Sequence, residues 1–392
     1  MIKLLLFSSL FPNSQQPSHG IFVENRLRKL QESGEIEVKV IAPVPWFPFK
    51  NSRFGLYSKY ARVPYTEERH NNQIIHPRYK IIPKAGMNFA PKSMAKATLP
   101  VIKKIITEGY NFDIIDAHYF YPDGIAATII GEELGKPVVI TSRGTDINLI
   151  PQYKKPRKMI MESSKKAAAM ITVCQALKTS MVEMGIEADK ITPLRNGVDL
   201  EFFTPTDNRE SLRSQLGMNR ITALSVGHLI DRKGHHLIID AMKSLASEPV
   251  DLIIIGDGEK REELKKQVLE KGLEQRIKFT GALDQQKLRD YYRAADILIL
   301  ASSREGWANV LLESMACGTP VVASNVWGTP EVVNSAEAGI LMKSLDAQGV
   351  TNGVKELLTN YPDRVKTRTY AEGFSWDQTT EGQLEIFRRL AL

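Results

Sequence analysis

The sequence has few cysteines and no long apolar run. Its two cysteines, Cys174 and Cys317, are too few for a disulfide framework in a chain of 392 residues, and neither has the spacing of a zinc site. No segment approaches the roughly 18 consecutive apolar residues that a membrane-spanning helix needs. The apolar run Lys3–Phe11 lacks the features of a signal peptide, so we interpret it as a first buried strand. The sequence therefore predicts a cytoplasmic protein.

Several motifs of other protein classes are also missing. The chain has no Walker A sequence, no HExxH and no GxSxG, and Gly256-Asp257-Gly258 lacks the remaining glycine and the acidic partner of a dinucleotide fingerprint. No DxD motif follows a strand, so we expect no metal and no cofactor. No basic motif interleaved with aromatic residues indicates nucleic-acid binding, and we expect no such partner.

Positive charge is unevenly divided along the chain. The whole sequence has 52 Lys and Arg against 45 Asp and Glu, a net charge of +7. Residues 1–195 hold 28 cations and 17 anions, a difference of +11, whereas residues 196–392 hold 24 and 28, a difference of −4. This asymmetry indicates that the two halves meet different partners.

Short apolar runs alternate with amphipathic stretches along the whole chain. The segments that we interpret as strands are Lys3–Phe7, Glu37–Ile41, Gln73–His76, Phe112–Asp116, Pro137–Thr141, Ala169–Val173, Ala223–Val226, Asp251–Ile255, Ile277–Thr280, Ile297–Ala301 and Pro320–Ala323. The segments that we interpret as helices are Gly20–Gln31, Ala95–Glu108, Gly124–Leu134, Gln175–Glu183, Leu237–Leu245, Lys260–Lys271, Gln285–Ala294 and Asn309–Ala316. This alternation predicts an α/β protein of two doubly wound domains that face each other across a cleft.

Two segments fit neither periodicity. Thr192–Pro205, with two prolines and an Asn-Gly pair, is interpreted as the loop that joins the domains. Pro43–Lys59, rich in Pro, Phe and Trp, is either a packed surface loop or a mobile active-site loop.

The segment Arg304–Ser324 is the most informative. A loop after a strand delivers Glu305 to the start of a helix, where the helix dipole stabilises a carboxylate, and Glu313 lies two turns further on. Two carboxylates in this arrangement can accept hydrogen bonds from a polyol, such as a sugar and a ribose. The alternative for such a pair is a solvated surface helix.

This segment resembles the signature of the retaining glycosyltransferases of family 4. The resemblance extends over nearly the whole chain, in SVGHLIDRKGHHLIIDAM, LRNGVDLEFFTP, IGDGEKREELKK, RIKFTGAL, WGTPEVV, FPNSQQPSHGIFVENRLRKL, DAHYFYPDG, TSRGTDIN and FSWDQTTEGQLEIF. The most similar branch builds bacterial surface polysaccharides or exopolysaccharides.

The resemblance implies the GT-B fold, with two facing Rossmann-like domains. Residues 1–195 would form the acceptor-side domain, joined by a terminal helix at 374–392, and residues 196–373 would bind a nucleotide-diphospho-sugar. It also implies a metal-independent hexosyl transfer, with retention, to a saccharide or lipid-linked acceptor.

The resemblance also assigns roles to individual residues. Glu305 would hold hydroxyls of the donor sugar, Glu313 the ribose, and Lys233 the diphosphate. Lys233 lies in a loop bounded by glycines, where a cation and backbone amides can bind phosphate. His118 would contact the donor sugar near the reacting carbon. Further donor contacts are expected from Gly306, Trp307, Ala308, Asn309, Val310, Lys278 and Phe279.

The sequence departs from the family's pattern at two positions. His228 stands where the family commonly has Arg, and a neutral imidazole supplies less charge to a diphosphate, so Arg195, or as a second candidate Arg143, could substitute. Arg143 stands where many relatives have His; with Asp146 we expect it on the acceptor side. Gly20 would let the backbone approach a phosphate or the reacting sugar, and the alternative is a structural helix start that is capped by Ser18.

A basic cluster lies within KKPRKMIMESSKK, residues 154–166. Its cations would dock on an anionic membrane surface, which would make the protein peripheral on the inner face of the plasma membrane; the alternative is a solvated helix face. Two other functions stay open, a GT-B-like nucleotide-sugar epimerase and a non-catalytic sugar-binding scaffold subunit.

Overall fold

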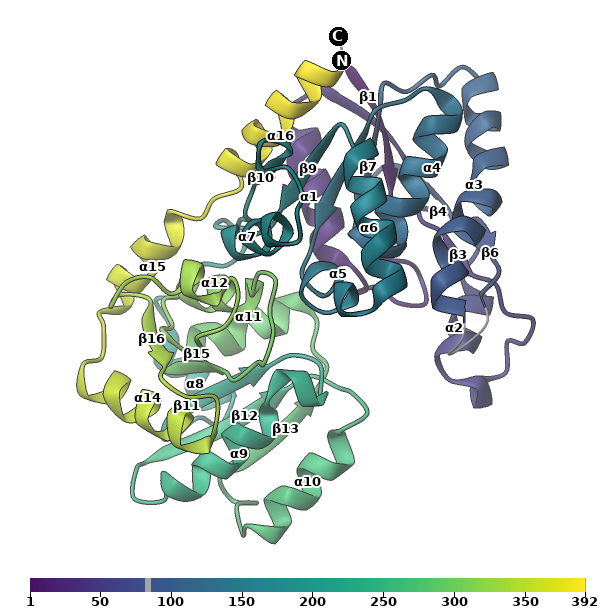
Figure 1. The fold of residues 1–392 in the computed structure, drawn as a ribbon. Helices are drawn as coiled ribbons and strands as arrows, with labels where there is room; N and C mark the ends of the chain where they lie inside the picture. The colour runs from purple at the N-terminus through teal and green to yellow at the C-terminus, as the bar shows by residue number, and fades with distance from the viewer. Residues whose placement is uncertain (82–85, 392) are drawn as a thin grey trace. The chain divides into compact units, whose positions relative to one another are not determined.

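The computed structural model describes residues 1–81 and 86–391, so Leu392, the end of the predicted terminal helix, lies outside the described residues. The chain forms two compact units. Unit 1 comprises Met1–Asn196 and Asp377–Leu392, and unit 2 comprises Gly197–Trp376. Each unit contains a largely or wholly parallel sheet with crossover helices (Figure 1), which confirms the predicted α/β class.

The eight-stranded sheet of unit 1 has the order β10-β9-β8-β7-β1-β2-β5-β4, with only the edge strand β4 antiparallel to its neighbour. Its strands are β1 (Ile2–Phe7), β2 (Ile36–Ile41), β4 (Thr66–Arg69), β5 (Asn72–Ile75), β7 (Ile114–His118), β8 (Val138–Ser142), β9 (Ala169–Thr172) and β10 (Ile191–Pro193). A separate parallel pair consists of β3 (Val44–Pro45) and β6 (Arg78–Tyr79).

The helices of unit 1 are α1 (Ile21–Glu32), α2 (Leu56–Arg62), α3 (Ala90–Thr107), α4 (Ile125–Leu134), α5 (Thr145–Asn148), α6 (Lys154–Lys166), α7 (Gln175–Glu183) and α16 (Asp377–Leu390). Helix α4 contacts both α3 and α6, and α16 lies beside α1 (Figure 1). The apolar face of α16 supplies Leu384 and Phe387 to the same core as Leu4 and Ile114 of the sheet. The last helix of the chain is therefore an integral part of unit 1.

Unit 2 has a six-stranded parallel sheet of order β13-β12-β11-β14-β15-β16. Its strands are β11 (Ile221–Val226), β12 (Val250–Ile255), β13 (Ile277–Gly281), β14 (Ile297–Leu300), β15 (Val321–Ser324) and β16 (Gly339–Met342). Its helices are α8 (Arg209–Gln215), α9 (His235–Ser244), α10 (Arg261–Glu270), α11 (Gln285–Ala294), α12 (Asn309–Ala316), α13 (Thr329–Val332), α14 (Ala347–Thr359) and α15 (Arg364–Glu372).

Both sheets reverse their strand order at the middle. In unit 1 the order turns between β1 and β7, and in unit 2 it turns between β11 and β14. At such a switch point the loops after the two strands run to opposite sides, which leaves a crevice at the carboxyl ends where ligands bind in doubly wound sheets. The loops after these four strands are therefore the places to look for a site.

Some local predictions are wrong in detail. The segment Pro43–Lys59, interpreted as a loop, contains β3 and most of α2, because contacts between aromatic rings, edge to face for Phe47 and Phe54 and tilted for Phe47 and Tyr57, order it without a regular period. The predicted loop from Thr192 begins inside β10, which adds a last parallel strand to the sheet.

Within the part of the chain that the structure describes, no helix is both long enough and apolar enough to cross a membrane.

Candidate active site

The switch point of unit 2 brings Lys233 and Glu305 together. Lys233 ends a short 3-10 turn, η6 (Asp231–Lys233), after β11, and Glu305 lies in the loop between β14 and α12. Nζ of Lys233 donates to Oε1 of Glu305 at 2.7 Å. Nη1 of Arg232 lies 3.6 Å from the other carboxylate oxygen, Oε2. Two residues that the sequence assigns to one ligand thus form one ion pair.

Glu305 is 7% exposed. Burial by itself raises its pKa, but the charges of Lys233 and Arg232, with hydrogen bonds from Lys233 and Ser302, bring that pKa below its ordinary value. The carboxylate is therefore ionised at neutral pH. Because two cations face this single carboxylate, the local charge suits a further anion.

A glycine allows the two loops to approach. Gly234 starts α9 in the left-handed region, with φ of +68°, and a Cβ at this position would lie 2.0 Å from the carbonyl oxygen of Ala301. A side chain would therefore push the loop that carries Lys233 away from the end of β14.

Glu313 lies on α12, and Tyr292 of α11 donates to it. The Tyr292 hydroxyl lies 3.0 Å from Oε2 of Glu313. Burial raises the pKa of Glu313 to about 7, although the Tyr292 hydrogen bond opposes the shift. Burial therefore favours the protonated form of Glu313, whereas the ion pair of Glu305 favours its ionised form.

The other loop residues that the sequence assigns to the donor lie around the start of α12. Gly306, Trp307 and Ala308 are buried, whereas Asn309 and Val310 are half-buried in the first turn. The N–H of Asn309 donates to the carbonyl of Trp307 at 3.2 Å, so this amide is already used inside the loop.

Three further residues that the sequence assigns to the donor lie in different places. His228 follows β11 and is exposed, and its Nδ1 lies 3.1 Å from the carbonyl oxygen of Asp257. Lys278 lines a small pocket with Gly217 and Asp251, at the amino-terminal side of the sheet. Phe279 packs in part against the core of unit 2. The structure therefore places the Lys278 side chain away from Lys233 and Glu305, because those two follow the carboxyl ends of their strands.

The switch point of unit 1 contains His118, the last residue of β7, which is 1% exposed. Its Nε2 lies 3.1 Å from Oδ2 of Asp116, and its Nδ1 lies 2.6 Å from Nη2 of Arg143. Burial lowers the pKa of His118 to about 4, with Arg143 and Arg26 acting in the same direction and Asp116 opposing them. The imidazole is therefore neutral, and both ring nitrogens have partners.

Arg143 and Asp146 shape the loop after β8. The Asp146 carboxylate accepts backbone hydrogen bonds from Phe120 and Gly144 at 2.7 Å and from Arg143 at 3.1 Å. Nη1 of Arg143 donates to Asn196 at 3.0 Å, and the guanidinium lies 5.2 Å from the ring centre of Phe22. The two residues are brought to His118 as a group.

Gly20 and Arg195 lie at the margins of this group. Gly20 is the N-cap of α1 with φ of +68°, and a Cβ there would lie 2.3 Å from the carbonyl oxygen of Leu10. Its close approach is thus to the chain itself, and Ser18 does not occupy the cap position. Arg195 is exposed, and its carbonyl accepts a hydrogen bond from the hydroxyl of Thr379.

Sequence reasoning missed three buried partners of the His118 group. Asp116, Arg26 and Gln383 lie within it, as described below. The only local signal was the alternation of Asp116 and His118 along one strand, since Arg26 and Gln383 are polar residues in amphipathic helices.

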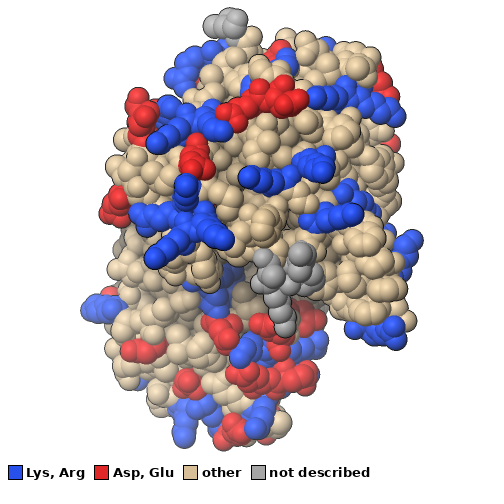
Figure 2. Space-filling view, turned by 45° about the vertical axis from the view of Figure 1, so that its right-hand side comes forward, with Lys and Arg blue, Asp and Glu red and all other residues tan. Residues whose placement is uncertain are grey.

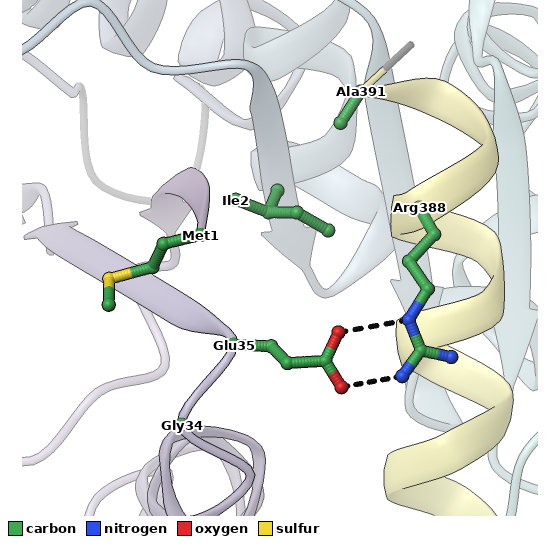
Figure 3. A pocket seen from close by; sticks show the side chains of 6 residues that line it. All are labelled: Met1, Ile2, Gly34, Glu35, Arg388 and Ala391. Atoms are coloured by element: carbon green, nitrogen blue, oxygen red, sulfur yellow. Dashed lines mark hydrogen bonds and ion pairs between the residues drawn. The ribbon is translucent and has the colours of Figure 1, made fainter.

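A pocket of about 450 Å³ lies at the other end of unit 1 (Figure 3). It is lined by Met1, Ile2, Gly34, Glu35, Arg388 and Ala391. Arg388 donates to both carboxylate oxygens of Glu35, at 3.0 and 2.5 Å. The pocket borders the starts of β1 and β2, so it is distinct from the group around His118.

Across residues 1–81 and 86–391 no cluster of His, Cys, Asp and Glu could hold a metal ion.

Comparisons with known proteins agree with this picture. The model of the family "Glycosyltransferase Family 4" matches residues 20–202, and that of "Glycosyl transferases group 1" matches residues 208–374. TuaC of Bacillus subtilis, whose name assigns it to glycosyl transfer in teichuronic acid biosynthesis, is 28% identical over 90% of this chain and 88% of its own. A D-inositol 3-phosphate glycosyltransferase of Xylanimonas cellulosilytica is 27% identical over 72% of each chain.

Solved structures share the fold. A sucrose-phosphate synthase of Thermosynechococcus elongatus superposes with a TM-score of 0.77 at 19% identity, covering 100% of this chain and 99% of its own. HepE of Anabaena, solved in complex with UDP, superposes with a TM-score of 0.74 at 20% identity, covering 99% and 100%.

Proposed function

The chain is a glycosyltransferase of the GT-B type, and we propose that it transfers a hexose from a nucleotide-diphospho-sugar to a saccharide or lipid-linked acceptor, with retention at the anomeric carbon. The observation that carries this proposal is the group of Lys233, Arg232 and Glu305, in which two cations surround one carboxylate at a switch point. HepE, which has the same fold, has been solved with UDP and with UDP-glucose, which supports a donor of this class.

In the proposed reaction the bond between the sugar and the diphosphate breaks and negative charge develops on the leaving phosphate. Lys233 and Arg232 would stabilise this charge, and their preorganised cations would take the place that a metal ion has in other transferases. Glu305 would accept hydrogen bonds from hydroxyls of the sugar and so orient it. The acceptor hydroxyl would attack the face that the leaving group vacates, and the phosphate would take its proton.

The remaining donor contacts follow from the same proposal. Glu313 would accept from the ribose hydroxyls, and its raised pKa makes it able to donate as well. Arg195 would add the fixed charge that His228 does not supply. The loop from Gly306 to Val310 would line the donor.

The acceptor side would be built by unit 1. Among the residues that the structure describes, the hydrogen-bond partners of the Arg143 guanidinium are His118 and Asn196, both neutral, although the charges of Asp116 and Asp146 also act on it. We therefore expect an acceptor with an anionic group, such as a phosphate or a uronate. Asp146 and Gly20 would hold the two loops that frame this group. The name of TuaC supports a product of the cell-surface polysaccharide class.

Helix α6 supports a peripheral position at an anionic membrane. Figure 2 shows groups of Lys and Arg side chains on one face of the molecule. Exposed cations along α6 are Lys154, Lys155, Arg157, Lys158, Lys165 and Lys166. Lys166 pairs with Glu132 at 2.7 Å and Lys158 approaches Glu162 at 3.8 Å. Because each cation near an anionic surface contributes about 1 kcal/mol, this helix suits a protein that reaches a lipid-linked acceptor from the cytoplasmic side.

A donor screen tests the function. Thermal unfolding is measured with UDP-, GDP- and ADP-sugars, each supplied with and without EDTA, and one class should raise the midpoint in both conditions. A ligand at 100 times its Kd adds about 2.7 kcal/mol to the free energy of unfolding. Proton NMR of the product from the stabilising donor then gives the anomeric configuration. Inversion at that carbon refutes retention, and stabilisation only without EDTA refutes metal independence.

A further inference from the structure

A continuous line of buried hydrogen bonds runs from α1 to the loop after β8. Nε of Arg26 donates to Oε1 of Gln383 at 2.8 Å, and Nε2 of Gln383 donates to Oδ2 of Asp116 at 3.1 Å. The same oxygen lies 3.1 Å from Nε2 of His118, whose Nδ1 faces Arg143 at 2.6 Å. All five residues belong to unit 1.

The two arginines at the ends of this line determine which ring nitrogen of His118 carries the hydrogen. A guanidinium has only donors, so Arg26 fixes the Gln383 amide with its oxygen toward α1 and its NH₂ toward Asp116. Oδ2 of Asp116 therefore accepts from Gln383 and from His118. At the other end Arg143 also can only donate, so Nδ1 of His118 carries a lone pair and Nε2 carries the hydrogen.

We propose that Arg26 and Gln383 are positioning residues that hold His118 in the neutral tautomer with hydrogen on Nε2, so that Nδ1 is a hydrogen-bond acceptor in the active site. When a substrate hydroxyl replaces Arg143, Nδ1 can accept its hydrogen bond. The catalytic consequence rests on the proposed function, whereas the tautomer itself does not.

The burial of the line supports this role. Arg26 and Gln383 are each 1% exposed, and their side chains come from helices that are separated by most of the chain. Helix α16 is held in place by its apolar contacts with the sheet and by the Arg388–Glu35 pair at its far end (Figure 3). All the bonds along the line are made, and a buried polar network of this kind can rigidify its site, although Nη2 of Arg26 and Nε of Arg143 have no hydrogen-bond partner among the described residues.

The test reads the imidazole directly. The full-length chain is labelled with ¹⁵N-histidine, and long-range proton–nitrogen spectra are recorded for wild type, Gln383→Met and Arg26→Lys. The His118 signals are identified by their loss in His118→Asn. Gln383→Met keeps the shape of the side chain and removes both hydrogen bonds, and Gln378→Met, on the exposed side of the same helix, is the matched control.

We expect wild type and Gln378→Met to show a pyridine-like Nδ1 and a pyrrole-like Nε2 at neutral pH. In Gln383→Met the Asp116 carboxylate loses the donor that fixes its orientation toward Nε2 of His118, so the two ring nitrogens should move toward averaged shifts, and Arg26→Lys should lie between. If a donor is turned over, kcat should fall about tenfold in Gln383→Met, equivalent to about 1.4 kcal/mol, with little change in the donor KM.

Two outcomes would overturn the inference. One is a wild-type imidazole with hydrogen on Nδ1, and the other is a Gln383→Met spectrum that matches wild type in a folded protein. An inactive protein whose His118 shifts still respond to Gln383→Met would reject the proposed function and leave the tautomer assignment intact.

Discussion

Glu305→Gln should bind a nucleoside diphosphate more tightly and yet turn over more slowly. In wild type, Nζ of Lys233 is held at 2.7 Å by a carboxylate that also repels an incoming diphosphate. The amide keeps the size and one acceptor oxygen of the side chain and removes the charge. Lys233 and Arg232 then present two cations to the ligand without a competing anion.

The expected change in diphosphate affinity follows from the strength of the Lys233–Glu305 ion pair. Two unit charges 2.7 Å apart attract by about 6 kcal/mol at an effective dielectric constant of about 20, but most of this is offset by desolvation. A hydrogen bond between charged groups contributes about 1.5–3 kcal/mol net. Taking the lower end, because Lys233 keeps part of its contact with the amide oxygen, the Kd should fall about tenfold. Turnover should fall at least about a hundredfold, because the sugar loses a charged acceptor.

Substitution of the other member of the ion pair, Lys233, should change diphosphate affinity in the opposite direction. Lys233→Met removes a cation from the proposed phosphate site, so it should weaken diphosphate binding by about a hundredfold, and turnover should fall as well. Calorimetry with the nucleoside diphosphate chosen by the donor screen measures both variants, with Glu356→Gln on the exposed side of α14 as a control. If the two residues form only a structural bridge, both variants will change affinity in the same direction, and that result refutes the reasoning.

Three further perturbations test other parts of the structure. Because burial raises the pKa of Glu313 to about 7, the folded chain binds more protons at this group than the unfolded chain does, and the resulting stabilisation, up to about 3 kcal/mol, should be lost as pH rises from about 5 to 8. Urea unfolding at several pH values should show this decrease in the free energy of unfolding for wild type but not for Glu313→Gln. Equal pH dependence of the two proteins would contradict the prediction. Gly234→Ala should lower the free energy of unfolding by at least about 2 kcal/mol, since its Cβ would lie 2.0 Å from Ala301 O, and an unchanged midpoint would show that the loop can move. Replacing Lys154, Lys155 and Arg157 with Ser should weaken co-sedimentation with anionic vesicles by about a hundredfold, and equal binding would leave α6 a solvated face.

Local patterns predicted much of the fold. The helices Gln285–Ala294 and Asn309–Ala316 have the predicted bounds, because each lies between an apolar strand and a clear stop. The antiparallel edge strand β4, with the sequence TEER, was missed because both of its faces are polar. Strand β16 was missed because it is only four residues long and begins at a glycine.

The residues of the candidate site were also predicted only in part from the sequence. The motifs singled out Lys233 and Glu305 and placed Glu305 at the start of a helix, whereas the charges nearest to it come from the loop after another strand. It also found His118 but not its buried partners. Arg26 and Gln383 are 357 positions apart, and nothing in either helix alone indicates that a guanidinium is buried there against a specific amide.

The return of α16 to unit 1 has a consequence for the order in which the chain folds as it is made. Unit 2 is contiguous, so it can fold as soon as Trp376 has emerged from the ribosome, although it is encoded after most of unit 1. Until α16 follows, Arg26 lacks the amide of Gln383 and the apolar surface around Leu4 and Ile114 stays uncovered. Of the two units, unit 1 begins to be synthesised first and is completed last, and a released chain that ends at Trp376 should hold a protease-resistant unit 2 beside a protease-sensitive unit 1.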